Sequence, residues 1–243
     1  MTVAAIVPAA GRGDRLGPGQ PKALRTLGGV PMLVHAVRAL SRARLVDLVV
    51  VAAPPDGVGD VKALLALHDI GAEVLVVAGG AERQDSVARA LEALPPAVDV
   101  VLVHDAARPL APSELVDAVA GAVLAGHIAV VPGVPMADTV KRIAPGEPRD
   151  GGERGPRSEL VSETVSRSDL RCIQTPQGFD RAVLAKAHAM ADATLTDDAG
   201  LVERLGLPVV VVEGSAEAFK ITRPIDLLLA EAVLLERRAN GAL

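Results

Sequence analysis

The residues best suited to chemistry stand in a glycine-rich turn that follows the first apolar run of the chain. Residues 8–16 read Pro-Ala-Ala-Gly-Arg-Gly-Asp-Arg-Leu, and Pro21-Lys22 follows shortly after. Small residues allow backbone N–H groups to come close to phosphate oxygens. Within residues 12–25, four basic side chains outnumber one acidic side chain by three; the basic ones are Arg12, Arg15, Lys22 and Arg25. This turn predicts a polyphosphate site, because a turn that only reverses the chain does not account for Arg15 and Lys22.

Two commoner phosphate loops do not fit this turn. A dinucleotide fingerprint needs a third Gly or Ala where Leu16 stands, and an acidic residue about 20 positions further on. A P-loop needs a Gly-Lys pair followed by Ser or Thr, and the chain contains no Gly-Lys pair. The turn therefore indicates a different class of nucleotide site.

Further polar groups follow other apolar runs. Residues 79–87 read as a turn and a helix start, and Asp105 is placed either to hold a metal or hydroxyl or to cap a helix. His104 is interpreted as a hydrogen-bonded core residue. Residues 196–198 read as an N-cap with acidic first-turn residues. Lys220 is expected at a strand end, where a lone cation is usually solvated.

Alternating strands and helices must position these groups. Apolar strands are predicted at 3–7, 46–52, 74–77, 100–103, 128–131 and 209–212, and helices at 32–40, 87–94, 113–124, 181–190 and 224–238. Strands that are apolar on both faces are typical of a sheet covered by helices on both sides. The pattern predicts an α/β fold with a doubly wound, mostly parallel sheet.

Residues 144–158 interrupt this alternation with Gly, Pro and charged residues. The flanks at 139–143 and 159–165 are expected to pair as a β-hairpin. Two interpretations stay open for the segment between them: a solvated surface loop, or an arm that reaches a partner subunit.

Composition excludes several function classes. The 243 residues contain no Trp, no Tyr and two Phe, so there is no aromatic platform for stacking nucleic-acid bases. A net charge of −5 argues against a general polyanion binder. The one cysteine, Cys172, excludes an internal disulfide and is expected to be a small buried hydrophobe. Because no secretory signal or membrane span is recognisable, we expect a soluble, cytoplasmic protein.

Seven motifs together carry a family resemblance. In order along the chain they are PAAGRGDRLG with PK, GGAERQDSV, HDAARP, ADTVKR, QTPQGF, TDDAG and FKITRP. From about Val3 to Glu231 the sequence resembles the 2-C-methyl-D-erythritol 4-phosphate cytidylyltransferases of the non-mevalonate isoprenoid pathway. The resemblance implies a single Rossmann-like nucleotidyltransferase domain over residues 1–243, with a protruding β-arm for dimerisation at about 136–170.

The resemblance also implies the reaction and its residues. CMP is transferred from CTP to 2-C-methyl-D-erythritol 4-phosphate, with release of pyrophosphate. The catalytic residues implied are Arg15, Lys22, Arg167 and Lys220. Those implied at the nucleotide are Pro8, Ala9, Ala10, Gly11, Gly80, Arg83, Ser86 and Asp105. Those implied at the acceptor are Asp105, Ala106, Thr139, Arg167, Thr175, Thr196 and Lys220. Thr139 and Arg167 are expected from the partner's arm in a homodimer.

The chemistry expected of such a site needs no covalent nucleophile. A phosphate monoester has a second pKa of ~6 and is already ionised at neutral pH. The protein has to neutralise charge around two polyanions, with Mg²⁺ held mainly by the CTP phosphates and no dedicated protein metal site.

Three alternatives compete with this function. Ribitol-5-phosphate cytidylyltransferase is the nearest, because it shares most phosphate-binding residues. A nucleotide-sugar glycosyltransferase normally carries an Asp-x-Asp metal motif, which the sequence lacks. A non-catalytic nucleotide sensor is disfavoured by the presence of Arg15, Lys22, Arg167 and Lys220.

Overall fold

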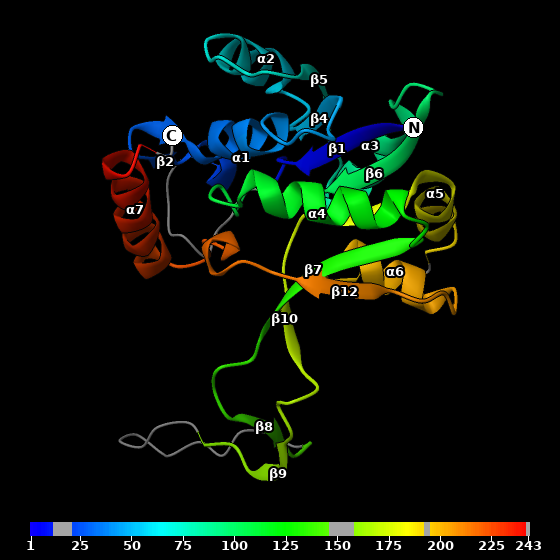
Figure 1. Ribbon diagram of the computed structural model, residues 1–243, viewed down its shortest axis with the longest axis vertical. Helices are drawn as coiled ribbons and strands as arrows, with labels where there is room; N and C mark the ends of the chain where they lie inside the picture. The colour runs from blue at the N-terminus through cyan, green and yellow to red at the C-terminus, as the bar shows by residue number, and fades with distance from the viewer. Residues whose placement is uncertain (12–20, 146–157, 192–194, 242–243) are drawn as a thin grey trace.

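An eight-stranded mixed sheet forms the centre of the protein in the computed structural model, which describes residues 1–11, 21–145, 158–191 and 195–241 (Figure 1). The strand order is β10-β7-β11-β6-β1-β4-β5, and β12 pairs with β7. The strands are β1 (Thr2–Pro8), β4 (Leu48–Ala53), β5 (Glu73–Ala78), β6 (Val98–Val103), β7 (Ala129–Pro135), β10 (Arg171–Ile173), β11 (Gln177–Asp180) and β12 (Val210–Glu213).

Most of the sheet is parallel. Strand β1 pairs in parallel with β4 and β6, β4 pairs with β5, and β12 pairs with β7. Strand β11 runs antiparallel between β6 and β7, and the short β10 pairs antiparallel with β7. The predicted doubly wound, mostly parallel sheet is therefore confirmed.

Helices cover both faces of this sheet. Neighbouring residues of a strand point to opposite sides, and here both sides carry apolar side chains that must be covered. On β1, Val3, Ala5 and Val7 pack into one core, whereas Ala4 and Ile6 pack into the other. The first core is completed by α1 (Met32–Ser41), α2 (Val58–Ala66) and α4 (Ser113–Leu124). The second is completed by α3 (Arg83–Glu92), α5 (Arg181–Ala189) and α6 (Asp198–Arg204).

The chain order reverses beside β1, and this reversal determines where a site can form. From β1 the chain proceeds outward to β4 and β5, and α3 then returns it to β6 on the other side of β1. Crevices open at the carboxyl ends of strands at such a point. The glycine-rich turn, residues 79–87 and Asp105 all follow strands next to this crevice.

Several elements differ from the sequence predictions, among them the antiparallel strands β10 and β11, which were not predicted. Helix α2 was not predicted, since its short apolar face buries only Val61 and Leu65. Strand β7 extends to Pro135, beyond the predicted end at residue 131, because β10 and β12 both pair with its last residues.

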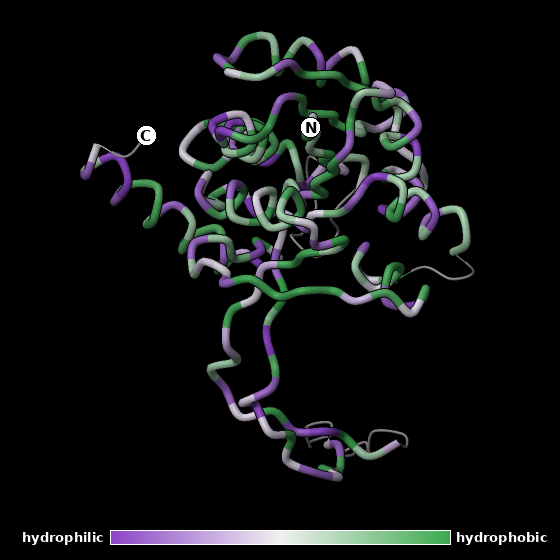
Figure 2. The backbone as a smooth tube through the Cα atoms, turned by 45° about the vertical axis from the view of Figure 1, so that its right-hand side comes forward, coloured by the Kyte–Doolittle hydropathy of each residue, from purple (hydrophilic) through white to green (hydrophobic). Residues whose placement is uncertain are grey.

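The predicted hairpin is present as β8 (Val140–Ile143) paired antiparallel with β9 (Val161–Val165). It stands away from the body of the molecule in both views (Figures 1 and 2). Polar cross-strand contacts hold it, including Lys141 Nζ to Thr164 Oγ1 at 2.6 Å and the Arg142–Glu163 ion pair at 2.7 Å. Of the segment at 144–158 that was interpreted as a surface loop or an arm, residues 146–157 lie outside the described residues.

The remaining elements lie around the body. They are the 3₁₀ helices η2 (Lys22–Leu24) and η4 (Ala216–Ala218), the short β2 (Thr26–Leu27) and β3 (Val30–Pro31), and α7 (Pro224–Ala239). Helix α7 buries Ala230 and Leu234 against Leu27, Met32 and Ile221. Within the described ranges, no helix is long and apolar enough to cross a membrane.

Candidate active site

A cleft of about 200 Å³ opens where the loops after β1, β5 and β6 meet. All eight predicted nucleotide residues line it, together with both predicted catalytic lysines. The lining residues are Pro8, Ala9, Ala10, Gly11, Lys22, Ala23, Gly80, Ala81, Glu82, Arg83, Ser86, Asp105, Ala106, Ala107 and Lys220. The fold thus gathers four separate sequence motifs at one edge of the sheet.

Backbone contacts fix the first loop of the cleft. The N–H of Ala9 donates to Ala52 O at 2.8 Å, which continues the pairing of β1 with β4 beyond the strand end. A Cβ atom on Gly79 would lie 2.8 Å from the Ala10 Cβ, so the loops after β1 and β5 can approach only if residue 79 is glycine.

The start of α3 forms the second wall. The Ser86 hydroxyl accepts from the Gly80 N–H at 3.1 Å and donates to Glu82 O at 3.0 Å. Glu82 and Asp85 form a capping box at this helix start, so the predicted turn and helix start are confirmed. The Ser86 side chain is therefore a fixed part of the cleft wall.

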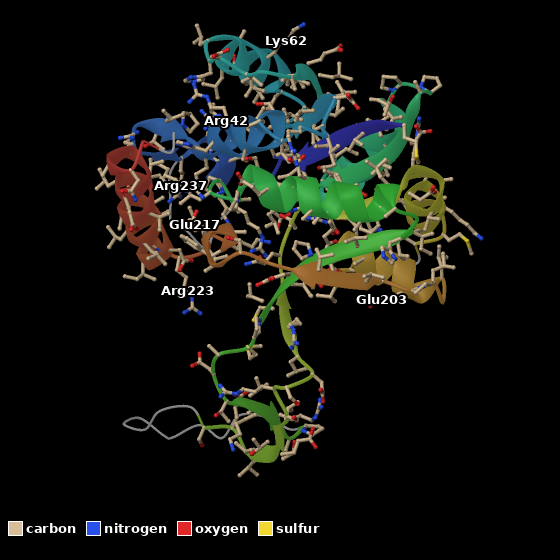
Figure 3. All side chains as sticks on the ribbon, viewed as in Figure 1. Arg42, Lys62, Glu203, Glu217, Arg223 and Arg237 are labelled. Carbon is tan, nitrogen blue, oxygen red and sulfur yellow. The ribbon has the colours of Figure 1, made fainter. Side chains whose placement is uncertain are left out.

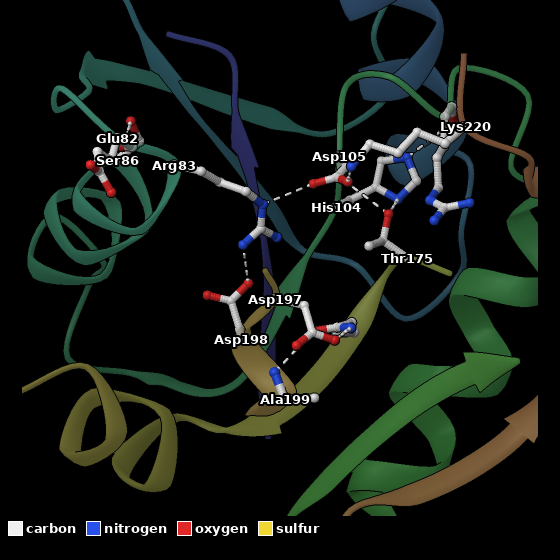
Figure 4. Close-up of polar contacts among 12 residues, drawn as sticks. Glu82, Arg83, Ser86, His104, Asp105, Thr175, Asp197, Asp198, Ala199 and Lys220 are labelled. Atoms are coloured by element: carbon white, nitrogen blue, oxygen red, sulfur yellow. Dashed lines mark hydrogen bonds and ion pairs between the residues drawn. The ribbon is translucent and has the colours of Figure 1, made fainter. Parts of the chain in front are cut away.

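Asp105 binds two cations and is the electrostatic centre of the cleft (Figure 4). Its Oδ1 accepts from Arg83 Nε at 3.0 Å, and its Oδ2 accepts from Lys220 Nζ at 2.7 Å. Burial alone would raise the pKa of Asp105, but the charges of Arg83 and Lys220 hold that pKa well below its ordinary value. The helix-cap interpretation of Asp105 is wrong, because the next helix, α4, begins only at Ser113.

Lys220 is held in the cleft by its flanking backbone. The N–H of Ile221 donates to Ala107 O at 2.8 Å, and Arg108 Nη1 donates to Ala218 O at 2.6 Å. The prediction that Lys220 ends a strand is wrong, because β12 ends at Glu213 and a 3₁₀ helix intervenes. The interpretation of a solvated lone cation is also wrong, because Asp105 binds its amine.

His104 lies beneath the cleft and supports the Asp105 backbone. Its Nε2 is 3.2 Å from Arg108 O, and because a carbonyl can only accept, Nε2 carries the proton. Its Nδ1 accepts from the Thr175 hydroxyl at 3.2 Å, and that hydroxyl accepts from the Asp105 N–H at 3.0 Å. Burial lowers the pKa of His104 to about 4. The interpretation of a hydrogen-bonded core histidine is confirmed.

Asp198 and His188 were not recognised from the sequence as part of this cluster. Asp198 Oδ2 accepts from Arg83 Nη1 at 2.7 Å, and Asp198 Oδ1 lies 3.0 Å from His188 Nε2. The predicted cap is confirmed in that Asp197 is the N-cap of α6 and accepts from the Gly200 N–H at 3.1 Å. No local pattern distinguishes Asp198 from an ordinary first-turn acid, because its partners come from α3 and α5.

Several predicted site residues are not gathered at the cleft of this chain. Thr139 and Arg167 are exposed beside the β8–β9 hairpin, and the Arg167 guanidinium donates to Ala137 O. Thr196 is exposed just before the α6 cap. Thr175 is buried under Asp105 rather than lining the cleft. Arg15 lies outside the described residues.

Cys172 contradicts its sequence interpretation. The thiol was expected to be buried, but Cys172 is exposed on the short strand β10, where its Sγ is 3.4 Å from Met136 Sδ. In the three-residue strand β10, Arg171 and Cys172 are exposed and only Ile173 is partly buried, so residue type alone does not bury the thiol.

A larger cavity, about 550 Å³, lies between α1, α7 and residues 109–114. None of the predicted site residues that the structure describes lines it. Its Arg237 is bound to Glu217 and donates to Leu110 O at 2.6 Å, so this cation is already neutralised within the chain (Figure 3). The positions of the predicted site residues therefore favour the smaller cleft as the active site.

Among the described residues, no group of three or more His, Cys, Asp or Glu side chains is arranged to hold a metal ion. Asp105 is the buried carboxylate that lines the cleft, and each of its oxygens already accepts from a cation.

A doubly wound sheet with a glycine-rich, cationic cleft at its switch point defines a nucleotide-binding α/β protein of the nucleotidyltransferase type. Residues 3–236 match the model of the 2-C-methyl-D-erythritol 4-phosphate cytidylyltransferase family. The chain belongs to this family.

Relatives of this chain carry the name of the family. The 2-C-methyl-D-erythritol 4-phosphate cytidylyltransferase of Streptomyces coelicolor is 59% identical over 243 residues, covering 98% of this chain and 86% of the relative. That of Saccharopolyspora erythraea is 51% identical, covering 96% of this chain and all of the relative. The crystal structure of the Thermus thermophilus cytidylyltransferase is 40% identical, covers 96% of this chain and 98% of its own, and superimposes with a TM-score of 0.72.

Proposed function

We propose that this chain transfers CMP from CTP to 2-C-methyl-D-erythritol 4-phosphate, giving 4-diphosphocytidyl-2-C-methyl-D-erythritol and pyrophosphate in isoprenoid precursor biosynthesis. The observation that carries the proposal is the cleft in which Lys22 and the Arg83–Asp105–Lys220 cluster meet the small-residue loop after β1. Family membership supplies the identity of the two substrates.

The reaction is a phosphoryl-type substitution at the α-phosphorus of CTP. An oxygen of the acceptor phosphate forms the new P–O bond, and the bond to the β-phosphate oxygen breaks, so that pyrophosphate leaves with the electron pair. The acceptor phosphate has a second pKa of ~6, so it is ionised at neutral pH and needs no general base. Catalysis then depends on placing two polyanions together and stabilising the charge that develops.

The cations divide this work between the two substrates. Lys22 on η2, with Arg15 from the preceding part of the sequence, is proposed to stabilise the CTP phosphates in the transition state. Lys220 is proposed to hold the acceptor phosphate while Asp105 fixes its amine. Mg²⁺ bound on the CTP phosphates would neutralise further charge. The small residues Ala9, Ala10 and Gly11, with Gly80 and Ser86, are proposed to bind the cytidine through backbone groups and one hydroxyl.

We further propose a cytoplasmic homodimer in which the chain forms one domain and residues 136–170 form the dimerisation arm. The hairpin supports this because β8 and β9 have almost no buried side chains of their own. Thr139 and Arg167 lie beside that hairpin, and the proposal brings them to the acceptor in the partner's cleft.

A pyrophosphate-release assay tests the function. Four nucleoside triphosphates are crossed with methylerythritol phosphate and ribitol 5-phosphate in the presence of Mg²⁺. CTP with methylerythritol phosphate is expected to give the highest kcat/KM. A higher kcat/KM with ribitol 5-phosphate would overturn the assignment in favour of ribitol-5-phosphate cytidylyltransferase.

A further inference from the structure

Arg83 lies between two carboxylates, and only one of them lines the cleft (Figure 4). Its Nε donates to Asp105 Oδ1 at 3.0 Å, and its Nη1 donates to Asp198 Oδ2 at 2.7 Å. Asp198 is behind Arg83, in the first turn of α6, and its side chain is 1% exposed. The guanidinium is therefore fixed at both ends of its planar group.

Asp198 is supported from its other side. His188 Nε2, on α5, lies 3.0 Å from Asp198 Oδ1, and the His188 side chain is 5% exposed. Burial alone would raise the pKa of Asp198, but the hydrogen bond from His188 and the charge of Arg83 lower that pKa below its ordinary value. A buried carboxylate is tolerated because both of its oxygens are bound in this way.

The helix that carries Asp198 does not need this side chain as a cap. Asp197 is the N-cap of α6, accepting from the Gly200 N–H at 3.1 Å and from Gln177 Nε2 at 2.8 Å. The Asp198 side chain instead makes its two bonds to residues of α3 and α5. A role confined to starting the helix does not account for those bonds.

The interaction of Asp198 with Arg83 affects the cleft through a second carboxylate, that of Asp105. Because Asp198 binds Nη1, the Arg83 Nε faces Asp105 Oδ1, and Asp105 Oδ2 is left for the Lys220 amine at 2.7 Å. We propose that Asp198, held by His188, is a positioning residue that orients Arg83 and, through Asp105, the Lys220 amine toward the acceptor phosphate. The proposal rests on the proposed function for the identity of that acceptor.

Asp198→Asn removes the charge while keeping the shape of the side chain. The amide has a single acceptor oxygen, so it cannot hold both Arg83 and His188 as the carboxylate does. A small displacement of a positioned group costs up to about 100-fold in rate, so we expect kcat/KM for the acceptor to fall by about tenfold to a hundredfold. The matched control is Asp197→Asn, the same substitution one residue earlier, which is expected to lower Tm at most and to leave kcat unchanged.

A spectroscopic signal separates positioning from simple support of the fold. The chain has five lysines, so ¹³Cε-lysine labelling gives a small spectrum in which Lys220 is assigned by its loss in Lys220→Arg. In Asp198→Asn without substrates, the Lys220 signal is expected to move toward those of the other lysines; in Asp197→Asn it is expected to stay. If Asp198→Asn does not fold by circular dichroism, His188→Ala provides the test, with the same Lys220 displacement and a loss in kcat/KM of about fivefold.

A double-mutant cycle tests the route through Arg83. If Asp198 acts through Arg83, Asp198→Asn should cause no further loss of kcat/KM in an Arg83→Ala background. Equal losses in both backgrounds, or an unmoved Lys220 signal in a folded Asp198→Asn protein, would overturn the proposal. If the wild-type protein shows no cytidylyl transfer while the Lys220 signal still moves, the proposed function fails and the positioning by Asp198 stands.

Discussion

His104 is expected to make the stability of this protein strongly dependent on pH between 4 and 6.5. The side chain is fully buried, and its neutral form is satisfied at both ring nitrogens, by Arg108 O and the Thr175 hydroxyl. Burial lowers its pKa from 6.5 to about 4. In the unfolded chain His104 takes up a proton as the pH falls below about 6.5, whereas in the folded chain it stays neutral until about 4.

The sign and size of the effect follow from this difference. Between these two values the unfolded state binds more protons, so the free energy of unfolding falls as the pH falls. One pH unit of pKa difference corresponds to ~1.4 kcal/mol, which gives a loss of about 3 kcal/mol by pH 4 from this residue alone. The carboxylates Asp105 and Asp198, whose pKa values are lowered, lose their contributions only below about pH 4.

The assay is urea unfolding from pH 4.5 to 7.5 at fixed protein concentration. Far-UV circular dichroism is the suitable probe, because the chain contains no Trp or Tyr whose fluorescence could report unfolding. His104→Gln should be less stable at pH 7.5 but should lose clearly less stability than the wild type as the pH is lowered. His127→Gln is the control, because the His127 side chain is exposed. Equal pH slopes for wild type and His104→Gln would refute the reasoning.

Four further predictions concern the site and the arm. Lys22→Ala should lower kcat by ~10²–10³ with a smaller change in the KM for CTP, since the cation stabilises charge that develops in the transition state; a change in KM alone would make it a binding group. Co-expressed Lys22→Ala and Arg167→Ala chains should recover roughly a quarter of the normal sites if the arm crosses to the partner, because about half of randomly paired dimers are mixed and each has one intact site. No recovery in a purified mixed dimer would refute the crossing. Asp105→Asn should lower kcat/KM about 100-fold, because an amide oxygen cannot hold both cations in place; near-normal steady-state kinetics would contradict this. Cys172 is exposed, so the native protein should react with one equivalent of a thiol reagent as fast as the unfolded chain does; slow labelling of the native protein would show that the thiol is covered.

Most of the fold was predictable because local sequence patterns indicate its strands and helices. Strands apolar on both faces, helices with one apolar face and a Gly-Pro-rich interruption each arise from residues close in sequence. Helix α4 matches its predicted bounds, and the hairpin pairs as expected. Helix α2 was not predicted, because it buries only two side chains and its sequence therefore shows little helical periodicity.

The sequence by itself determined which residue types could bind phosphate and that they follow strand ends beside one edge of a parallel sheet. Only the tertiary structure decided which charges pair, because ion pairs form across sequence separations that no local pattern records. Asp105 and Lys220 are 115 residues apart, as are Arg83 and Asp198, and both pairs form within 2.7 Å. The same reason explains the errors. Considered as a lone cation without the family resemblance, Lys220 was interpreted as solvated, and Cys172 was expected to be buried. Burial depends on what packs over a residue, and that is a property of the folded chain.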